Sequence, residues 1–147
     1  FTGPEPPGGF SSWKYELSID YDVHRSSSEI SSFKFDVYMF TGGAHSIHKI
    51  YTKSYNLESG EELKLSDIFK KDSEYLNVIS NLSYTQLVKS GRLGDFLRES
   101  WVKEGTSPNE ENFKNFALKE NSIIFFFPAY QVAPWAAGVA PADRKPA

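Results

Sequence analysis

Apolar and polar side chains alternate with a period of two along the first part of the chain. The alternation covers residues 15–23, 33–39 and 47–57. Such alternation is typical of half-exposed strands in an antiparallel sheet, where the apolar residues form the buried face. Residues 25–28 separate the first two runs as a turn, and residues 58–61 form a hairpin turn after the third.

The middle of the chain changes to helical spacing. Tyr75, Ile79 and Leu82 lie three and four positions apart, which predicts an amphipathic helix. Residues 95–102 predict a second, shorter helix. Ser107-Pro108-Asn109-Glu110 has the signature of a capping box, with Ser107 as the N-cap of one or two further helical turns.

Two more strands follow these helices, over residues 116–118 and 123–127. Pro128 stops the second of them, and Phe126 is a candidate core residue, as is Phe35 in the first part of the chain. The order of strands, helices and strands predicts an α+β fold. We expect an antiparallel β-sheet with a layer of two or three helices packed on one face.

The length of 147 residues is that of a single domain. Residues 1–12 are rich in proline and glycine and predict a flexible tail, whereas residues 139–147 show no periodicity and predict a second tail. Residues 13–138 form the single α+β domain, within which residues 13–32 are a candidate for the end of a companion domain. Phe1 is not an initiator methionine, so we expect a processed or truncated product.

Composition narrows the range of functions. The net charge of −3 does not favour nucleic-acid binding, which requires clustered Lys and Arg. The absence of cysteine excludes disulfides, thiolate chemistry and cysteine metal sites. Aromatic residues make up 16% of the chain, which suits a sheet core rich in Phe and Tyr or, alternatively, a surface aromatic platform.

Five segments, taken in order, carry a resemblance to a known family. They are TGGAH at residues 41–45, YNLESGEEL at 55–63, LSDIF at 65–69, NFAL at 115–118 and FFFPAYQVAPWAAG at 125–138. Together they resemble the C-terminal extracellular domain of the RsiV anti-sigma factors, a bacterial domain of unknown function. The same domain is found beside PdaC-type polysaccharide deacetylases. The resemblance implies an extracytoplasmic protein, either secreted or anchored to the cell envelope.

The resemblance also implies a binding site. The best understood members of this group bind lysozyme outside the cell through a loop with a Pro-x-Tyr step, which corresponds here to Pro128 and Tyr130. The same loop continues to Pro134 and Trp135. Because Tyr and Trp are favoured anchors of protein interfaces, these four residues are the candidate binding site. The alternative is that the loop packs over the open end of the sheet.

A second motif joins Gly42, Gly43 and His45. The two glycines permit positive φ or close backbone approach, and the imidazole can bond the backbone beside them. The chain departs from the family pattern at residues 139–147, where the family has another strand. If that strand is absent, a sheet edge is open to a partner strand and to oligomer formation.

Catalytic and metal-binding sets are not evident in the sequence. His45 and His48 are three positions apart, which on a strand places them on opposite faces, and a third ligand is lacking. The carboxylates of residues 58–62 lie around a turn, and Asp20 and Asp22 lie on the polar face of a strand, where solvated charges are the ordinary outcome. We therefore predict no catalytic residues, no metal and no cofactor.

The favoured function is a non-catalytic binding module of the bacterial cell envelope. Its predicted partner is a protein such as lysozyme, or peptidoglycan, with no nucleic acid involved and membrane attachment only through a segment outside this chain. A glycan-active enzyme, xylanase-like or deacetylase-associated, is one alternative, and it would need two carboxylates facing across a cleft. A self-assembling surface protein that exchanges strands is the other.

Overall fold

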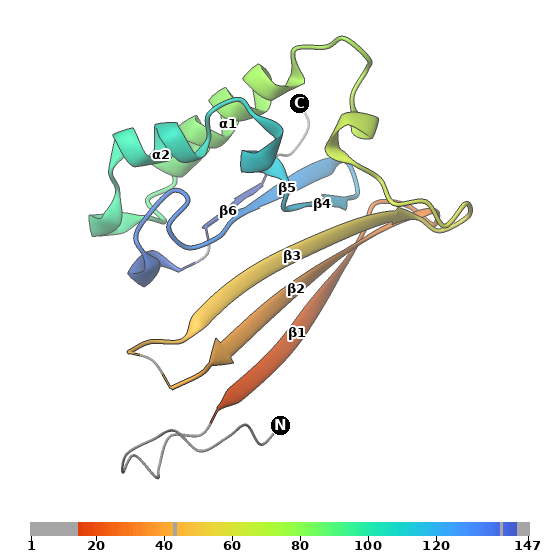
Figure 1. Cartoon of the computed structure of the whole chain (residues 1–147). Helices are drawn as coiled ribbons and strands as arrows, with labels where there is room; N and C mark the ends of the chain where they lie inside the picture. Colours follow the sequence, from red (N-terminus) through yellow and green to blue (C-terminus); the bar gives the residue numbers. More distant parts are fainter. Residues whose placement is uncertain (1–14, 43, 139, 144–147) are drawn as a thin grey trace.

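The computed structural model describes residues 15–42, 44–138 and 140–143. Its strands form two antiparallel sheets of three strands each (Figure 1). The first sheet has the order β1 (Glu16–Arg25), β2 (Ile30–Phe40) and β3 (Ile47–Asn56). The second has the order β4 (Phe116–Lys119), β5 (Ser122–Phe127) and β6 (Ala140–Asp143). The predicted tail at residues 1–12 lies outside the described residues.

The helical layer consists of two α-helices and several short 3₁₀ turns. They are α1 (Tyr75–Lys89), α2 (Glu99–Gly105), η1 (Leu65–Ile68), η2 (Gly94–Phe96), η3 (Glu110–Phe113) and η4 (Trp135–Ala137). Figure 1 shows the two α-helices above the second sheet and the first sheet below it. The predicted α+β class is confirmed, although the strands form two sheets rather than one.

The larger core lies between the helical layer and the second sheet. Phe113 packs edge-on against Phe125 and Phe127, with ring centroids 5.1 and 6.0 Å apart. Ile79 from α1 and Val102 from α2 are buried in the same cluster. This arrangement follows from the predicted helix and strand patterns, since each apolar face needs an apolar partner.

The polar face of the first sheet, not its apolar face, is turned toward the second sheet. Ser32 and Ser54 are buried there, and their hydroxyls are 2.7 Å apart. The backbone N–H of Leu118 donates to the hydroxyl of Ser32 (2.8 Å), and that of Phe116 donates to the hydroxyl of Thr52 (2.9 Å). The hydroxyls thereby satisfy N–H groups on the outer edge of β4, which face away from β5.

The expectation that the apolar face of the first sheet is buried is therefore wrong. Phe35, a candidate core residue, lies on the outward face beside Tyr21 and Tyr51, whereas Phe126 is buried as expected. A period of two shows that a strand has two different faces, but it does not show which of them meets the rest of the protein.

Several predicted boundaries also differ from the structure. Residues 140–143, assigned to a tail, form β6 and pair with β5, which satisfies the second edge of β5. The N-cap near the proline is Asn109 rather than Ser107, because the turn begins at Glu110 and the Asn109 side chain accepts the Asn112 N–H. Leu82 is 43% exposed and lies outside the buried stripe of α1.

Replacing Ser32 tests the hydroxyl contacts between the sheets. Ser32→Ala leaves the Leu118 N–H without its partner, so we expect the free energy of unfolding to fall by about 1–3 kcal/mol. Urea unfolding followed by tryptophan fluorescence measures this change. Ser18→Ala, on the same face of the sheet but without a bond to β4, is the matched control. Equal losses in the two variants would contradict the assigned role of Ser32.

The phenol of Tyr75 provides a second test, at the start of α1. Its ring stacks on Phe69 at 4.5 Å and its hydroxyl donates to Glu110 (2.7 Å). Burial, followed by this hydrogen bond, raises the pKa of Tyr75 to about 12. A pKa raised by folding stabilises the native state below about pH 10, the unfolded value, and that contribution is lost as the pH rises toward the folded value.

We expect Glu110→Gln to lower the pKa of Tyr75 toward its ordinary value, since the carboxylate that favours the neutral phenol is gone. Ultraviolet titration of the phenolate absorbance measures this pKa, and Tyr75→Phe identifies the transition that belongs to Tyr75. Glu111→Gln is the control, because Glu111 bonds Lys114 instead. An unchanged titration in Glu110→Gln would show that burial alone sets the pKa.

Candidate functional site

The loop after β5 is held in place by its own backbone. The N–H of Tyr130 donates to the carbonyl of Ala133 (2.9 Å), and the N–H of Gln131 donates to that of Pro128 (3.1 Å). Val132 and Ala133 are buried in the main core. Part of the loop therefore packs as the alternative hypothesis expected, but this packing is done by residues other than Tyr130.

The helical layer fixes the loop from the other side. The indole N–H of Trp101 on α2 donates to the carbonyl of Tyr130 (3.0 Å). The side-chain amide of Gln131 donates to the carbonyls of Gly105 (2.9 Å) and Asn112 (2.8 Å). These bonds join the loop to α2 and to η3, so the loop has a defined position relative to both.

Gly105 makes this close approach feasible. A Cβ atom at this position would lie 2.0 Å from the carbonyl oxygen of Gln131, which is far inside van der Waals contact. Only a residue without a side chain fits between α2 and the loop. This contact could not be predicted from the sequence, because the two residues are far apart along the chain.

Tyr130 projects from this anchored loop into solvent. Its side chain is 57% exposed, and its backbone has φ of +71°, in the left-handed region that residues other than glycine seldom occupy. Pro128, Pro134 and Trp135 are half-buried around it along the loop. Their part in binding stays a prediction, and the structure shows which of the four residues is most accessible.

Trp135 brings the second motif next to this loop. Its ring centroid lies 5.5 Å from that of His45 and 6.1 Å from that of His48. His48 in turn contacts the ring of Tyr38, with centroids 5.0 Å apart. We call Tyr38, His45, His48 and Trp135 the aromatic cluster.

The sequence predicted a role for His45 beside the glycines and for Trp135 in the loop, but not the contact between them. His45 lies in the loop before β3, so the alternation of faces within a strand does not separate it from His48. Its Nδ1 is 3.0 Å from the backbone carbonyl of Ser46, which agrees with the predicted contact to local backbone. Gly42 has φ of +84°, a conformation that favours glycine, and Gly43 lies outside the described residues.

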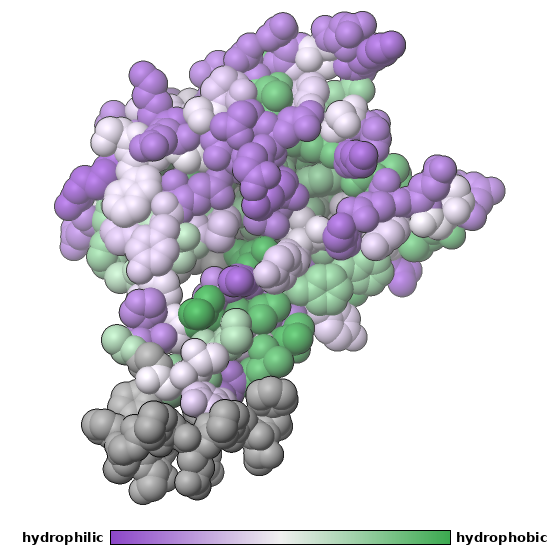
Figure 2. Space-filling model, in the orientation of Figure 1, coloured by the Kyte–Doolittle hydropathy of each residue, from purple (hydrophilic) through white to green (hydrophobic). Residues whose placement is uncertain are grey.

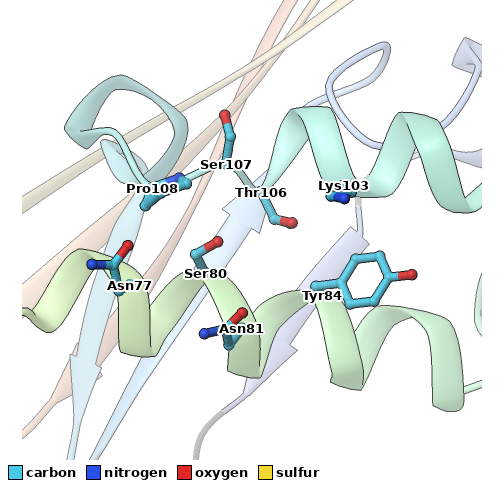
Figure 3. A pocket seen from close by; sticks show the side chains of 8 residues that line it. All are labelled: Asn77, Ser80, Asn81, Tyr84, Lys103, Thr106, Ser107 and Pro108. Atoms are coloured by element: carbon cyan, nitrogen blue, oxygen red, sulfur yellow. The ribbon is translucent and has the colours of Figure 1, made fainter.

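A polar cavity of about 360 Å³ lies between α1 and the end of α2 (Figure 3). Its lining combines amides, hydroxyls and one amine: Asn77, Ser80, Asn81, Tyr84, Lys103, Thr106, Ser107 and Pro108. Figure 3 shows Asn77, Ser80, Asn81 and Tyr84 coming from one helix and the other residues from the opposite wall. The hydroxyl of Tyr84 donates to Glu99 (3.1 Å), and this bond raises the pKa of Tyr84.

The carboxylates near the second groove are already engaged. This groove lies between β3 and η3, and its lining includes Glu62, Glu110 and Glu111. Glu62 bonds Lys53 at 2.6 Å and raises the pKa of that amine. Glu110 accepts from Tyr75, and Glu111 pairs with Lys114. Each of these three carboxylates therefore has a side-chain partner.

Neither a cluster of metal-binding side chains nor a membrane-spanning helix is found in the part of the chain that the structure describes. Among residues 15–42, 44–138 and 140–143, no group of three His, Asp or Glu side chains is placed to hold a metal ion. Over the same ranges, no helix has both the length and the apolar character needed to cross a bilayer.

Gly105→Ala tests the anchoring of the loop. The added methyl must displace the backbone at Gln131, so we expect a loss of about 1–3 kcal/mol in the free energy of unfolding. Lys103→Ala, at an exposed site on the same helix, should change it by no more than about 0.5 kcal/mol. Thermal or urea unfolding distinguishes them, and equal stabilities would show that the loop moves aside freely.

Comparison with known proteins agrees with this architecture. The family model for a protein of unknown function, DUF3298, matches residues 66–140, and the model described as deacetylase PdaC matches residues 8–48. A curated relative is the peptidoglycan-N-acetylmuramic acid deacetylase PdaC of Bacillus subtilis. It is 36% identical over 118 residues, which make up 80% of this chain and 25% of the deacetylase.

Solved structures show the same fold. A DUF3298 family member from Bacteroides fragilis superposes with a TM-score of 0.72 at 25% identity, covering 92% of this chain and 53% of that protein. A DUF3298 family protein from Pseudomonas aeruginosa has a TM-score of 0.59 at 15% identity, covering 86% and 56%. The resemblance inferred from the sequence is thereby confirmed, and the chain belongs to the DUF3298 family.

Proposed function

We propose that this chain is a non-catalytic, extracytoplasmic binding module of the bacterial cell envelope. It recognises a protein such as lysozyme through the loop from Pro128 to Trp135. The observation that carries the proposal is Tyr130, an exposed aromatic side chain on a loop whose backbone is fixed by α2 and η3. A rigid aromatic anchor loses little conformational freedom on binding, which favours affinity.

The backbone of Tyr130 supports a functional role for the loop. A non-glycine residue with positive φ costs on the order of 1–3 kcal/mol and persists only where the surroundings impose it. Here the imposed conformation directs a large aromatic side chain into solvent, where it contributes nothing to the core. Such an arrangement is typical of residues that contact a partner.

The location and the absence of catalysis have separate support. The relative from Bacillus subtilis is named as a peptidoglycan deacetylase, which is a cell-wall activity. Among the described residues, the lining of the polar cavity contains no carboxylate. The carboxylates that line the second groove are bonded to Lys or Tyr side chains. The matched region thus suits an envelope module that accompanies other activities without performing the hydrolysis.

The test is titration calorimetry against hen egg-white lysozyme. We expect the unmodified chain to bind, and Tyr130→Ala to weaken binding by about 30-fold or more, as for a central interface anchor. Tyr51→Ala is the matched control: Tyr51 is also an exposed tyrosine, but it lies on the outward face of the first sheet. Its affinity should equal that of the unmodified chain.

Equal weakening by both substitutions would contradict the loop as the interface. If neither the chain nor its variants bind lysozyme, a cell-wall glycan becomes the better candidate. The polar cavity of Figure 3 favours it, because amide and hydroxyl groups are suited to the hydroxyls and acetamides of a sugar. Self-assembly by strand exchange would require an open edge at β5. It is less favoured, because β6 pairs with β5 at that edge.

A further inference from the structure

The outward face of the first sheet is a continuous apolar surface. The strand register forms four cross-strand rows: Leu17–Met39–Ile47, Ile19–Val37–Lys49, Tyr21–Phe35–Tyr51 and Val23–Phe33–Lys53. On β1 the exposed fractions reach 64% for Leu17, 57% for Ile19 and 68% for Tyr21. Figure 2 shows apolar colour gathered over this sheet, below the polar surface of the helices.

A surface of this kind indicates an interface. Soluble proteins seldom expose contiguous apolar patches beyond a few hundred Å², and larger ones mark contact sites. This face cannot simply turn inward to join the core, because the opposite face is held against β4 by the hydroxyls of Ser32 and Thr52. What covers the outward face must therefore come from outside the described residues.

The dimensions of the face suit one α-helix. Its strands have 10 and 11 residues, which at about 3.3 Å per residue gives a length of roughly 33 Å. Three strands spaced by about 4.8 Å present a width of roughly 10–14 Å. A single helix is about 10 Å across and spans this length with about 20 residues.

The charged residues of this face lie along one edge of it, where they would meet one side of a bound helix. The β1 and β2 residues in the four rows are uncharged, whereas β3 contributes Lys49 and Lys53. Lys53 already bonds Glu62, but Lys49 is exposed and has no bond of this kind among the described residues. An acidic side chain beside β3 would complement it.

The relatives indicate where such a helix comes from. This chain covers only 53% and 56% of the two solved structures with the same fold, so each of those proteins carries about as much polypeptide again. The first sheet falls largely within the part matched by the PdaC model, residues 8–48, which differs from the model matching the helical layer. Additional polypeptide of the same protein is thus a natural source of the cover.

We propose that the outward face of the first sheet is the docking site of one amphipathic α-helix of about 20 residues. The helix belongs to the same protein, outside these 147 residues. Its apolar stripe lies along the strands, and an acidic side chain lies beside Lys49. This surface is separate from the Pro128–Trp135 loop, so the proposal does not depend on the proposed function.

The test uses the whole chain and two labelled peptides in fluorescence anisotropy. The first peptide is a designed helix with a Leu stripe and Glu on its flanks, and the second is the segment of the Bacillus subtilis deacetylase immediately ahead of its matched region. We expect both to bind and to compete. A designed peptide with Lys in place of Glu should bind about tenfold more weakly or worse.

Substitutions on opposite faces of β1 locate the site. Ile19→Asp should weaken both peptides at least about tenfold, whereas Ser18→Asp, with the same charge change on the inner face, should not. Since Ile19 is largely exposed, its replacement should leave the thermal unfolding of the chain intact. Three results would overturn the proposal: no binding, binding unaffected by Ile19→Asp, or failure of the deacetylase segment alone. A stable dimer dissociated by Ile19→Asp would do so too, by making a second copy the occupant.

Discussion

The outer edge of β4 is the constraint on which the rest of the structure depends. An edge strand buried in a protein must satisfy its free N–H groups, and an unpaired group costs about 1–3 kcal/mol. Here Ser32 and Thr52 supply hydroxyl acceptors from the face of a neighbouring sheet, rather than from another strand. Because those hydroxyls lie on the polar face of the first sheet, that face has to point inward.

The apolar face of the first sheet points outward as a direct consequence. Burying one large aliphatic or aromatic side chain stabilises a protein by about 1.5–3 kcal/mol. Exposing a row of such side chains to water therefore costs more free energy than the hydroxyl hydrogen bonds provide. An inward polar face and an outward apolar face are both energetically favourable only if the two faces of the sheet are each covered. A sheet covered on both sides, by β4 on one and a helix on the other, is an ordinary layered arrangement.

The sequence predicted the elements better than their orientation. The three long strands, the main helix and the α+β class follow from periodicity, which local side-chain spacing determines. The inward turn of Ser32, the approach of Gln131 to Gly105 and the meeting of His45 with Trp135 depend on contacts between distant residues, which periodicity does not record. β6 was missed for a local reason, since its sequence Ala-Pro-Ala-Asp consists of residue types that are depleted in strands.

The loop after β5 divides core packing and solvent exposure among its residues. Val132 and Ala133 bury themselves in the core, and Gln131 bonds α2 and η3, so these residues determine where the loop lies. Tyr130 sits among them with a strained backbone and an exposed ring, and it depends on its neighbours without adding to their packing. The hydrogen bonds of the loop explain the backbone of Tyr130, because its N–H donates to Ala133 and its carbonyl accepts from Trp101, but these bonds do not require an exposed aromatic ring. Under the proposed function, contact with a partner explains that ring, because a rigid exposed side chain loses little conformational entropy on association.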